Sequence, residues 1–253
     1  MILARKRRYR LDGEMLSLEE IIAKIEDGYM EVDSSLLESV QGEKILDLGC
    51  KIGVISSKIA QRNPQSHVVG VDYFPAYIDI ARVVYKNRQN TTFLPMNAYD
   101  LKFEDGFFDC VCMFEVIEHL NNPVKALREV NRVLRKDGSF IISTNNVYYA
   151  RFIAKYVLSL VTTQYRLRKM DHGACEEWFR HIYCWDLETF YTLMSEYGFE
   201  HEDHFFLGNL LFTSKNSFVR CFDKSLGYLF PIFRSVMVLK LRKIFELEQE
   251  KAF

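Results

Sequence analysis

The segment Asp47–Gly53 begins at the end of the apolar run Lys44–Leu48 and contains an acidic residue and two glycines. Glycine adopts backbone angles that let the chain pass close to a ligand, and the free N–H groups at the start of a following helix attract anionic groups. Asp47 could bind an ammonium group of a ligand at this loop. Gly49, Cys50 and Gly53 would border that ligand. A turn of this form also occurs where a strand and a helix merely pack tightly, so both interpretations stay open.

A second acidic residue, Asp72, ends the apolar run His67–Asp72 and follows Gly53 by 19 positions. Its carboxylate could accept hydrogen bonds from two ribose hydroxyls, and dinucleotide-binding enzymes share this spacing. An aspartate at the end of a strand can instead cap the following helix. Together the two segments indicate a nucleoside ligand, but they do not name a reaction.

Two further segments carry polar residues after apolar runs. After Thr91–Met96, the side chain of Asn97 and the backbone of Ala98 could bind the edge of an adenine ring, while Tyr73 could flank that ring or belong to the core. Phe114 ends the next apolar run and begins a polar cluster. The pattern E-x-x-E-H predicts three side chains on one side of a helical turn, those of Glu115, Glu118 and His119.

Apolar runs alternate with amphipathic stretches from about residue 43 to residue 146, which indicates parallel strands joined by helical crossovers. Ligands bind outside the carboxyl ends of the strands in such a sheet, where all four segments would lie. The sequence therefore predicts an α/β fold with a doubly wound, Rossmann-like sheet. Before it, Ser17 and Glu20 form a capping box, and residues 1–42 are expected to be a helical cover.

Beyond Asn146 the alternation stops, and residues 147–185, which are rich in Tyr and Arg, are interpreted as an inserted lid. Asp186 then caps a helix that Gly198 ends. Closing strands over 199–206 and 210–215 would give seven strands, the last of them antiparallel. The expected organisation is a helical cover, an α/β domain over 43–216 and a basic, apolar C-terminal extension over 217–253.

The overall composition limits the partners and the compartment. Lys and Arg (33) nearly balance Asp and Glu (34), so no net positive charge points to a nucleic acid, and none is expected as a partner. Six cysteines without paired C-x-x-C sets are typical of reduced thiols and favour a cytoplasmic location. The apolar stretch 226–241 is shorter than the ~20 residues of a membrane span. The C-terminal region could make a peripheral membrane contact or a homodimer.

Four ordered stretches carry a resemblance to a known family, namely ILDLGCKIG, VVGVD, FFDCVCMFEVIEHLNNPVKALREVNRVLRKDGSFIIST and RHIYCWDLETFYTLMSEYGF. They resemble the class I methyltransferases of the type 11 and type 23 families. The resemblance implies S-adenosylmethionine (SAM) as the cofactor. It implies that the methionyl part of SAM lies near Asp47, Gly49 and Gly53, the ribose at Asp72, the adenine at Asn97 and Ala98, and the sulfonium beside Phe114 and Glu115.

Lys51 departs from the family, which usually has glycine there, and Asn97 stands where relatives often have Asp. The lysine could strain the loop or pair with the cofactor carboxylate, and we favour the ion pair. In some ubiquinone-biosynthesis and small-RNA methyltransferases, a set similar to Glu115, Glu118 and His119 binds a divalent metal. Metal-free relatives also carry the final Glu-His, so we expect a structural role and no metal.

Methyl transfer from a sulfonium often needs only alignment and desolvation, so a catalytic base is optional. Where one is needed, imidazole and carboxylate groups are suitable. The candidates are His172 and His181, beside or within the lid, together with Glu118 and His119. Each histidine could equally have a structural role.

We therefore expect a SAM-dependent methyltransferase that acts on an O or N atom of a small molecule bound under an aromatic lid. One alternative is the same reaction on a lipid-linked or glycan intermediate at the membrane surface. Another is a non-catalytic SAM-binding protein, prompted by Lys51. The near-neutral charge disfavours RNA methylation, and the absence of G-x-G-x-x-G spacing disfavours a dehydrogenase.

Overall fold

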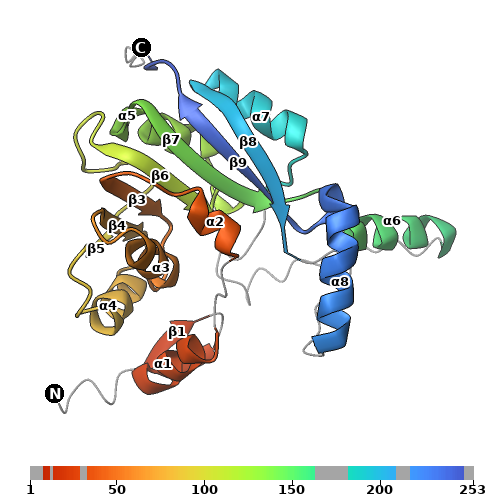
Figure 1. Ribbon diagram of the computed structural model, residues 1–253, viewed down its shortest axis with the longest axis horizontal. Helices are drawn as coiled ribbons and strands as arrows, with labels where there is room; N and C mark the ends of the chain where they lie inside the picture. The colour runs from red at the N-terminus through yellow and green to blue at the C-terminus, as the bar shows by residue number, and fades with distance from the viewer. Residues whose placement is uncertain (1–7, 12–13, 29–32, 163–181, 209–216, 248–253) are drawn as a thin grey trace.

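The computed structural model describes residues 8–11, 14–28, 33–162, 182–208 and 217–247, which contain two sheets. The large sheet has seven strands in the order β5-β4-β3-β6-β7-β9-β8 (Figure 1). Strands from β5 to β7 pair in parallel, whereas β9 is antiparallel to both β7 and β8. The prediction of a doubly wound, seven-stranded sheet whose last strand is antiparallel is confirmed.

The strands of the large sheet follow the apolar runs of the sequence. Their bounds are β3 Lys44–Leu48, β4 His67–Asp72, β5 Thr91–Pro95, β6 Phe108–Phe114, β7 Leu134–Asn145, β8 Phe199–Leu207 and β9 Val236–Lys243. Consecutive residues point to opposite faces, yet both Ile45 and Leu46 are fully buried. Continuous apolar runs are typical of strands that are covered on both faces.

Strand β9 is formed by residues that the sequence analysis assigned to a C-terminal extension. It lies between β7 and β8, and Met237, Val238 and Leu239 are fully buried there. A strand buried on both faces needs such an unbroken apolar run. The assignment is therefore corrected for residues 236–243, which complete the sheet. The other expected closing strand, 210–215, lies outside the described residues.

Helices cover both faces of the sheet. Helices α5 (Pro123–Val133) and α7 (Leu187–Glu196) pack on one face, and α2 (Ser34–Glu38) and α3 (Val54–Arg62) pack on the other. Helix α4 (Pro75–Val84) packs against β5. The expected cap at Asp186 is confirmed, because its side chain accepts hydrogen bonds from first-turn N–H groups of α7, and the side chain of Asn122 caps α5 in the same way.

The N-terminal residues pack at the beginning of α3 and α4. Helix α1 (Leu18–Glu26) has the expected capping box between Ser17 and Glu20. A hairpin of β1 (Arg8–Leu11) and β2 (Glu14–Ser17), which we did not predict, precedes it. One hydrophobic cluster joins this cover to the domain and contains Tyr9, Leu11, Ile21, Ile52, Val54, Tyr77 and Ile80.

The expected lid is described only in part, as helix α6 (Ala150–Thr162) and residues 182–185. Helix α8 (Ser217–Leu229) and the 3-10 helix η4 (Pro231–Phe233) precede β9. In Figure 1, α6 and α8 project beyond the right-hand end of the sheet. Within the described ranges, no helix is both long enough and apolar enough to cross a membrane.

Candidate cofactor and substrate site

The candidate site lies at the carboxyl edge of the sheet around β3 and β6. The chain continues from β3 to β4 on one side, while β6 is the neighbour of β3 on the other side. Ligands bind outside the strand ends at such a reversal of strand order. The four segments expected to bind the cofactor begin at this edge, since they follow β3, β4, β5 and β6.

The loop Gly49–Gly53 requires glycine at both ends. Gly49 has a φ of 85° and Gly53 a φ of 80°. A Cβ atom on Gly49 would lie 2.3 Å from Cγ2 of Val116, so glycine lets the loops after β3 and β6 approach closely. Helix α3 then begins at Val54 without a side-chain cap. Its N-terminus therefore suits an anionic group of a ligand.

Asp47 is buried beneath this loop, with 2% of its surface exposed. Its Oδ2 accepts a 2.5 Å hydrogen bond from Oγ of Ser56 in α3. Burial raises the pKa of Asp47 to about 6, and the nearby charge of Asp72 adds to this rise. A cationic group in the site would favour the charged carboxylate. The predicted role of Asp47 toward an ammonium group is compatible with this environment.

Asp72, at the end of β4, connects two loops. Its Oδ2 accepts from the backbone N–H of Lys51 at 2.8 Å, and its Oδ1 accepts from that of Phe74 at 2.9 Å. Burial raises the pKa of Asp72, while these hydrogen bonds and the charge of Lys51 oppose the rise. Lys51 itself has a φ of 51°, a left-handed conformation that glycine adopts without strain. The left-handed conformation on which the strain alternative depends is therefore present at Lys51.

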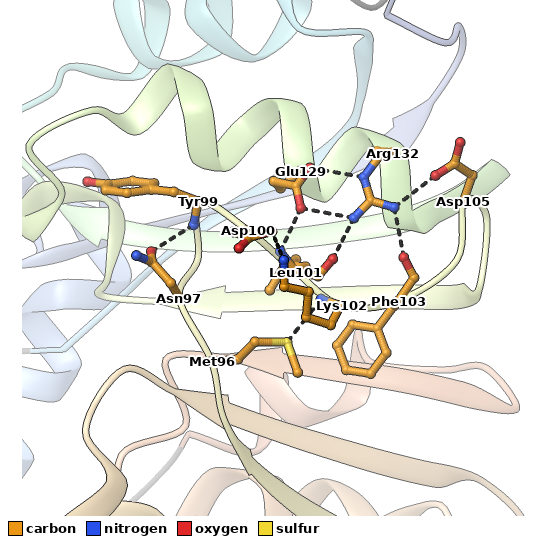
Figure 2. A network of polar contacts seen from close by, with 10 residues as sticks. All are labelled: Met96, Asn97, Tyr99, Asp100, Leu101, Lys102, Phe103, Asp105, Glu129 and Arg132. Atoms are coloured by element: carbon orange, nitrogen blue, oxygen red, sulfur yellow. Dashed lines mark hydrogen bonds and ion pairs between the residues drawn. The ribbon is translucent and has the colours of Figure 1, made fainter.

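The loop that carries Asn97 is held by α5, as Figure 2 shows. Oδ1 of Asn97 accepts from the backbone N–H of Tyr99 at 2.9 Å, which forms a local turn. Arg132 donates to the carbonyls of Leu101 and Phe103 at 2.7 and 2.8 Å. It also pairs with Glu129, which accepts from the N–H of Leu101 at 2.6 Å. The exposed Asn97 thus keeps a fixed position, although its oxygen already has one donor.

The two aromatic residues after β4 differ in their surroundings. Tyr73 is 63% exposed, whereas Phe74 packs in the cluster that joins the N-terminal cover to the domain. The two rings meet edge to face, with centroids 5.2 Å apart. Tyr73 is therefore available to flank a ligand ring next to Asp72, and Phe74 belongs to the core.

Glu115 and Glu118 follow β6 but do not share one helical turn. Glu115 has a φ of 52° and precedes the 3-10 helix η2 (Ile117–His119). Its N–H donates to O and Oγ of Ser143, at 3.0 and 3.2 Å. The predicted common side of a helical turn is wrong, because the left-handed residue breaks the helical spacing. In the described part of the chain, no three His, Cys, Asp or Glu residues form a group that could hold a metal ion.

The Glu118 carboxylate is fully buried against the end of β7. It accepts from Oγ1 of Thr144 at 3.1 Å and from Nδ2 of Asn145 at 3.2 Å. Burial raises the pKa of Glu118 to about 7, and the charge of Glu115 contributes. The sequence analysis missed the polar end of β7, although the same rule of residues at strand ends could have found it.

Residues 182–185 cover Glu118 from the lid side. The backbone N–H of Ile182 donates to the carbonyl of Glu118 at 2.7 Å. The ring of Tyr183 stacks on that of Trp185, with centroids 5.4 Å apart. An aromatic pair therefore lies in the segment that contacts the backbone of Glu118. His172 and His181 lie outside the described residues, and His119 is half-buried in η2.

The residues at this edge fit SAM. Asp47 and Asp72 end adjacent strands, and burial raises both pKa values, so a ligand with a positive charge and hydroxyl groups would stabilise the charged carboxylates. The uncapped N-terminus of α3 suits the carboxylate of the ligand. The exposed ring of Tyr73 suits its base.

A protein-family model and two curated proteins match parts of this chain. Residues 46–142 match the family model described as a methyltransferase domain. An uncharacterized protein of Methanocaldococcus jannaschii is 34% identical over 122 residues, covering 48% of this chain and 44% of that protein. The mitochondrial ubiquinone biosynthesis O-methyltransferase of Dictyostelium discoideum is 27% identical over 164 residues, covering 60% and 49%. The chain thus spans about half the length of these curated relatives.

Solved structures share the fold at low sequence identity. The methyltransferase bound to the Trm112 activator of Haloferax volcanii has a TM-score of 0.63 at 16% identity, covering 88% of this chain and 93% of that one. A SAM-dependent methyltransferase of Methanosarcina mazei has a TM-score of 0.60 at 18% identity, covering 86% and 100%. The [4+2]-cyclase SpnF has a TM-score of 0.56 at 17% identity, covering 83% and 80%. These likenesses show the fold alone.

We predict that Asp72→Asn weakens SAM binding at least about tenfold, because hydrogen bonds to a charged acceptor contribute about 1.5–3 kcal/mol each. Asparagine keeps one side-chain oxygen for the N–H of Lys51, so the loop is better preserved than with alanine. Isothermal titration calorimetry measures the affinity. Asp137→Asn is the control, because Asp137 lies near the amino end of β7 and its φ of 59° suits asparagine. Equal affinities of Asp72→Asn and wild type would remove Asp72 from the site.

For Lys51, we predict that Lys51→Gly weakens SAM binding, more so at low salt, because it removes a cation that pairs with the cofactor carboxylate. Lys51→Asn separates the two effects, since asparagine tolerates left-handed angles but carries no charge. Lys51→Arg, which keeps the charge, should bind nearly as wild type does. SAM titrations at two ionic strengths measure all four proteins. Tighter binding by Lys51→Gly at both strengths would show that strain dominates instead.

Proposed function

We propose that this chain, which contains a class I methyltransferase domain of the SAM-dependent kind, is an enzyme that transfers the SAM methyl group to an oxygen or nitrogen atom of a small molecule. The observation that carries the proposal is the pair of carboxyls at the ends of adjacent strands, the buried Asp47 and the partly buried Asp72, with the tight glycine loop beside them. This arrangement suits a charged nucleoside more than a neutral ligand.

Each part of the edge would hold a different part of the cofactor. Asp72 would accept from the ribose hydroxyls, and Asp47 would favour the ammonium group. The N-terminus of α3 would receive the carboxylate. Asn97 and Ala98 would lie at the adenine, and Phe114 and Glu115 would border the sulfonium. When bound, SAM supplies an electrophilic methyl group, and the residues of the chain align an acceptor with it and exclude water.

The acceptor would lie between the loop after β6 and residues 182–185. The stacked rings of Tyr183 and Trp185 suit an acceptor that carries a ring. The Dictyostelium relative is named for ubiquinone biosynthesis, which supports a hydroxyl-bearing ring as the first substrate class to test. Glu118 and His119 are the candidate bases among the described residues, and Glu118, with a pKa of about 7, is the one we favour to take a proton from such a hydroxyl. His172 and His181 remain alternative candidates.

A non-catalytic SAM-binding protein is the second candidate function. The left-handed Lys51 in the cofactor loop favours it, because a strained loop can reduce affinity. The cyclase among the proteins of the same fold illustrates that this fold does not fix the reaction.

The proposal predicts that the protein transfers the methyl group of labelled SAM to a phenol or catechol acceptor, or to a compound in a metabolite extract. Mass spectrometry identifies the product by the added methyl mass, and Asp72→Asn is the control for background transfer. SAM binding without a methylated product in either assay would favour the non-catalytic protein. Absence of SAM binding would contradict both functions.

We further predict that Glu118→Gln lowers kcat about a hundredfold. This is the lower end of the range expected for the loss of a general base. In the wild type, kcat should rise as the pH increases through about 7, because only the deprotonated carboxylate accepts a proton. This ionisation should disappear from the pH profile of the variant. Glu38→Gln is the control, since Glu38 pairs with Arg62 at the surface. A variant that keeps both the rate and the ionisation would leave Glu118 a purely structural role.

Protein stability gives a second readout for the same substitution. The pKa of Glu118 rises from 4.5 to about 7 on folding, so the folded state binds the proton more tightly. Its contribution to stability is therefore present below about pH 4.5 and is lost as the pH rises to about 7, by roughly 3 kcal/mol. Glu118→Gln should flatten this pH dependence in thermal unfolding, whether or not the residue acts in catalysis.

A further inference from the structure

Two helical parts of the chain expose large apolar side chains outside the sheet. On α6, the exposed fractions of Phe152, Val157 and Leu158 are 49%, 52% and 63%. At the junction of α8 and η4, those of Tyr228, Leu229 and Phe230 are 70%, 73% and 50%. Single exposed apolar residues are common, but several on linked elements mark an interaction surface. We call these six residues the apolar surface.

Asn146 links the two parts of the apolar surface. Its Nδ2 donates to the carbonyls of Ile232 and Arg234, at 2.6 and 2.8 Å, and so holds η4. Its Oδ1 accepts from the backbone N–H of Tyr148 at 3.0 Å, just before α6 begins. Asn146 is 1% exposed, so these bonds are shielded from water. The beginning of α6 and the segment after α8 are therefore fixed at one place, the carboxyl end of β7.

The segments around the apolar surface carry positive charge. Helix α6 carries two basic residues, Arg151 and Lys155, and no acidic residue. Helix α8 carries two basic residues, Arg220 and Lys224, and one acidic residue, Asp223, which is buried at 3% exposure. Apolar side chains accompanied by cations are typical of helices that lie on anionic lipid surfaces. Each of the two helices has only 13 residues, which suits lying on a bilayer rather than crossing it.

We propose that the apolar surface docks on an anionic lipid bilayer. A second copy of the chain fits less well, because a two-fold interface places the same patch on both sides and would set these cations against one another. A bilayer with acidic headgroups instead supplies opposite charge and an apolar interior. Docking would bury side chains that are now 49% to 73% exposed.

The end of β7 connects the apolar surface to the candidate site. Asn145, which donates to Glu118 at 3.2 Å, directly precedes Asn146. An acceptor dissolved in the bilayer would therefore meet the protein at the end of β7, close to Glu118. This substrate class, a membrane-dissolved acceptor, rests on the proposed function, whereas the docking itself does not.

Vesicle co-sedimentation of the full chain tests the docking without SAM or turnover. We expect binding to vesicles of phosphatidylcholine with roughly one third phosphatidylglycerol, and at least about tenfold weaker binding to phosphatidylcholine alone or at high salt. Leu158→Glu and Leu229→Glu should each weaken binding about tenfold or more. Each replaces an apolar side chain that docking would bury in the bilayer with an anionic one. Val83→Glu is the matched control, since Val83 is 45% exposed on α4, outside the apolar surface.

The outcomes separate the possible occupants. Failure to bind either vesicle, or equal binding by Leu158→Glu, Leu229→Glu and Val83→Glu, would overturn the proposal. A dimer in analytical ultracentrifugation that the two surface variants dissociate would also overturn it and identify a second copy as the occupant. SAM titration and thermal unfolding verify that each variant is folded. Lipid binding without methyl transfer would refute the proposed function alone, and the reverse result would refute the docking alone.

Discussion

The hydrogen bond from the backbone N–H of Lys51 to Asp72 joins the loops after β3 and β4, and the candidate cofactor site is arranged around this junction. The N–H groups of Gly49 and Cys50 both donate to the carbonyl of Val71, so three successive amides of one loop are fixed to the end of β4. The left-handed backbone at Lys51 belongs to this arrangement, and its strain is offset by the contacts that it accompanies. Asp72 therefore shapes the loop as well as offering a charge to a ligand.

Burial acts on all three carboxyls of the candidate site in the same direction. It is the largest cause of the raised pKa values of Asp47, Asp72 and Glu118. A buried carboxylate without a cation nearby carries an unfavourable desolvation energy, which a cationic ligand lowers. Hydrogen bonds from Ser56 and Thr144 offset only part of it. The electrostatics of these carboxyls thus favour a ligand with positive charge, which agrees with the charge of SAM.

The strands, their order at the ligand edge and the helix caps could be predicted because apolar runs and capping residues are local signals. Strand β9 was not predicted, because an apolar run can lie either in a sheet or on a surface. Which of the two it does depends on its pairing with β7 and β8, which are distant in the sequence. The orientation of the Glu118 side chain toward the end of β7 was not predicted. The prediction assumed a helical spacing from Glu115 onward, and the left-handed backbone of Glu115 interrupts that spacing. Arg132 fixes the loop of Asn97 through hydrogen bonds to backbone carbonyls. Every residue has such a carbonyl, so the sequence does not indicate which ones accept these bonds.

The end of β7 explains why the site and the apolar surface lie together. Four consecutive residues there bind three different parts of the chain. Ser143 accepts from Glu115, Thr144 and Asn145 donate to Glu118, and Asn146 donates to η4 and the residue after it. Because β7 lies between β6 and β9, its backbone is fixed on both sides. The loop after β6 therefore takes its position from β7 rather than from its own sequence. Asn146, which binds η4, is adjacent to Asn145, which donates a hydrogen bond to Glu118, so the end of β7 connects the proposed docking surface to the proposed chemistry.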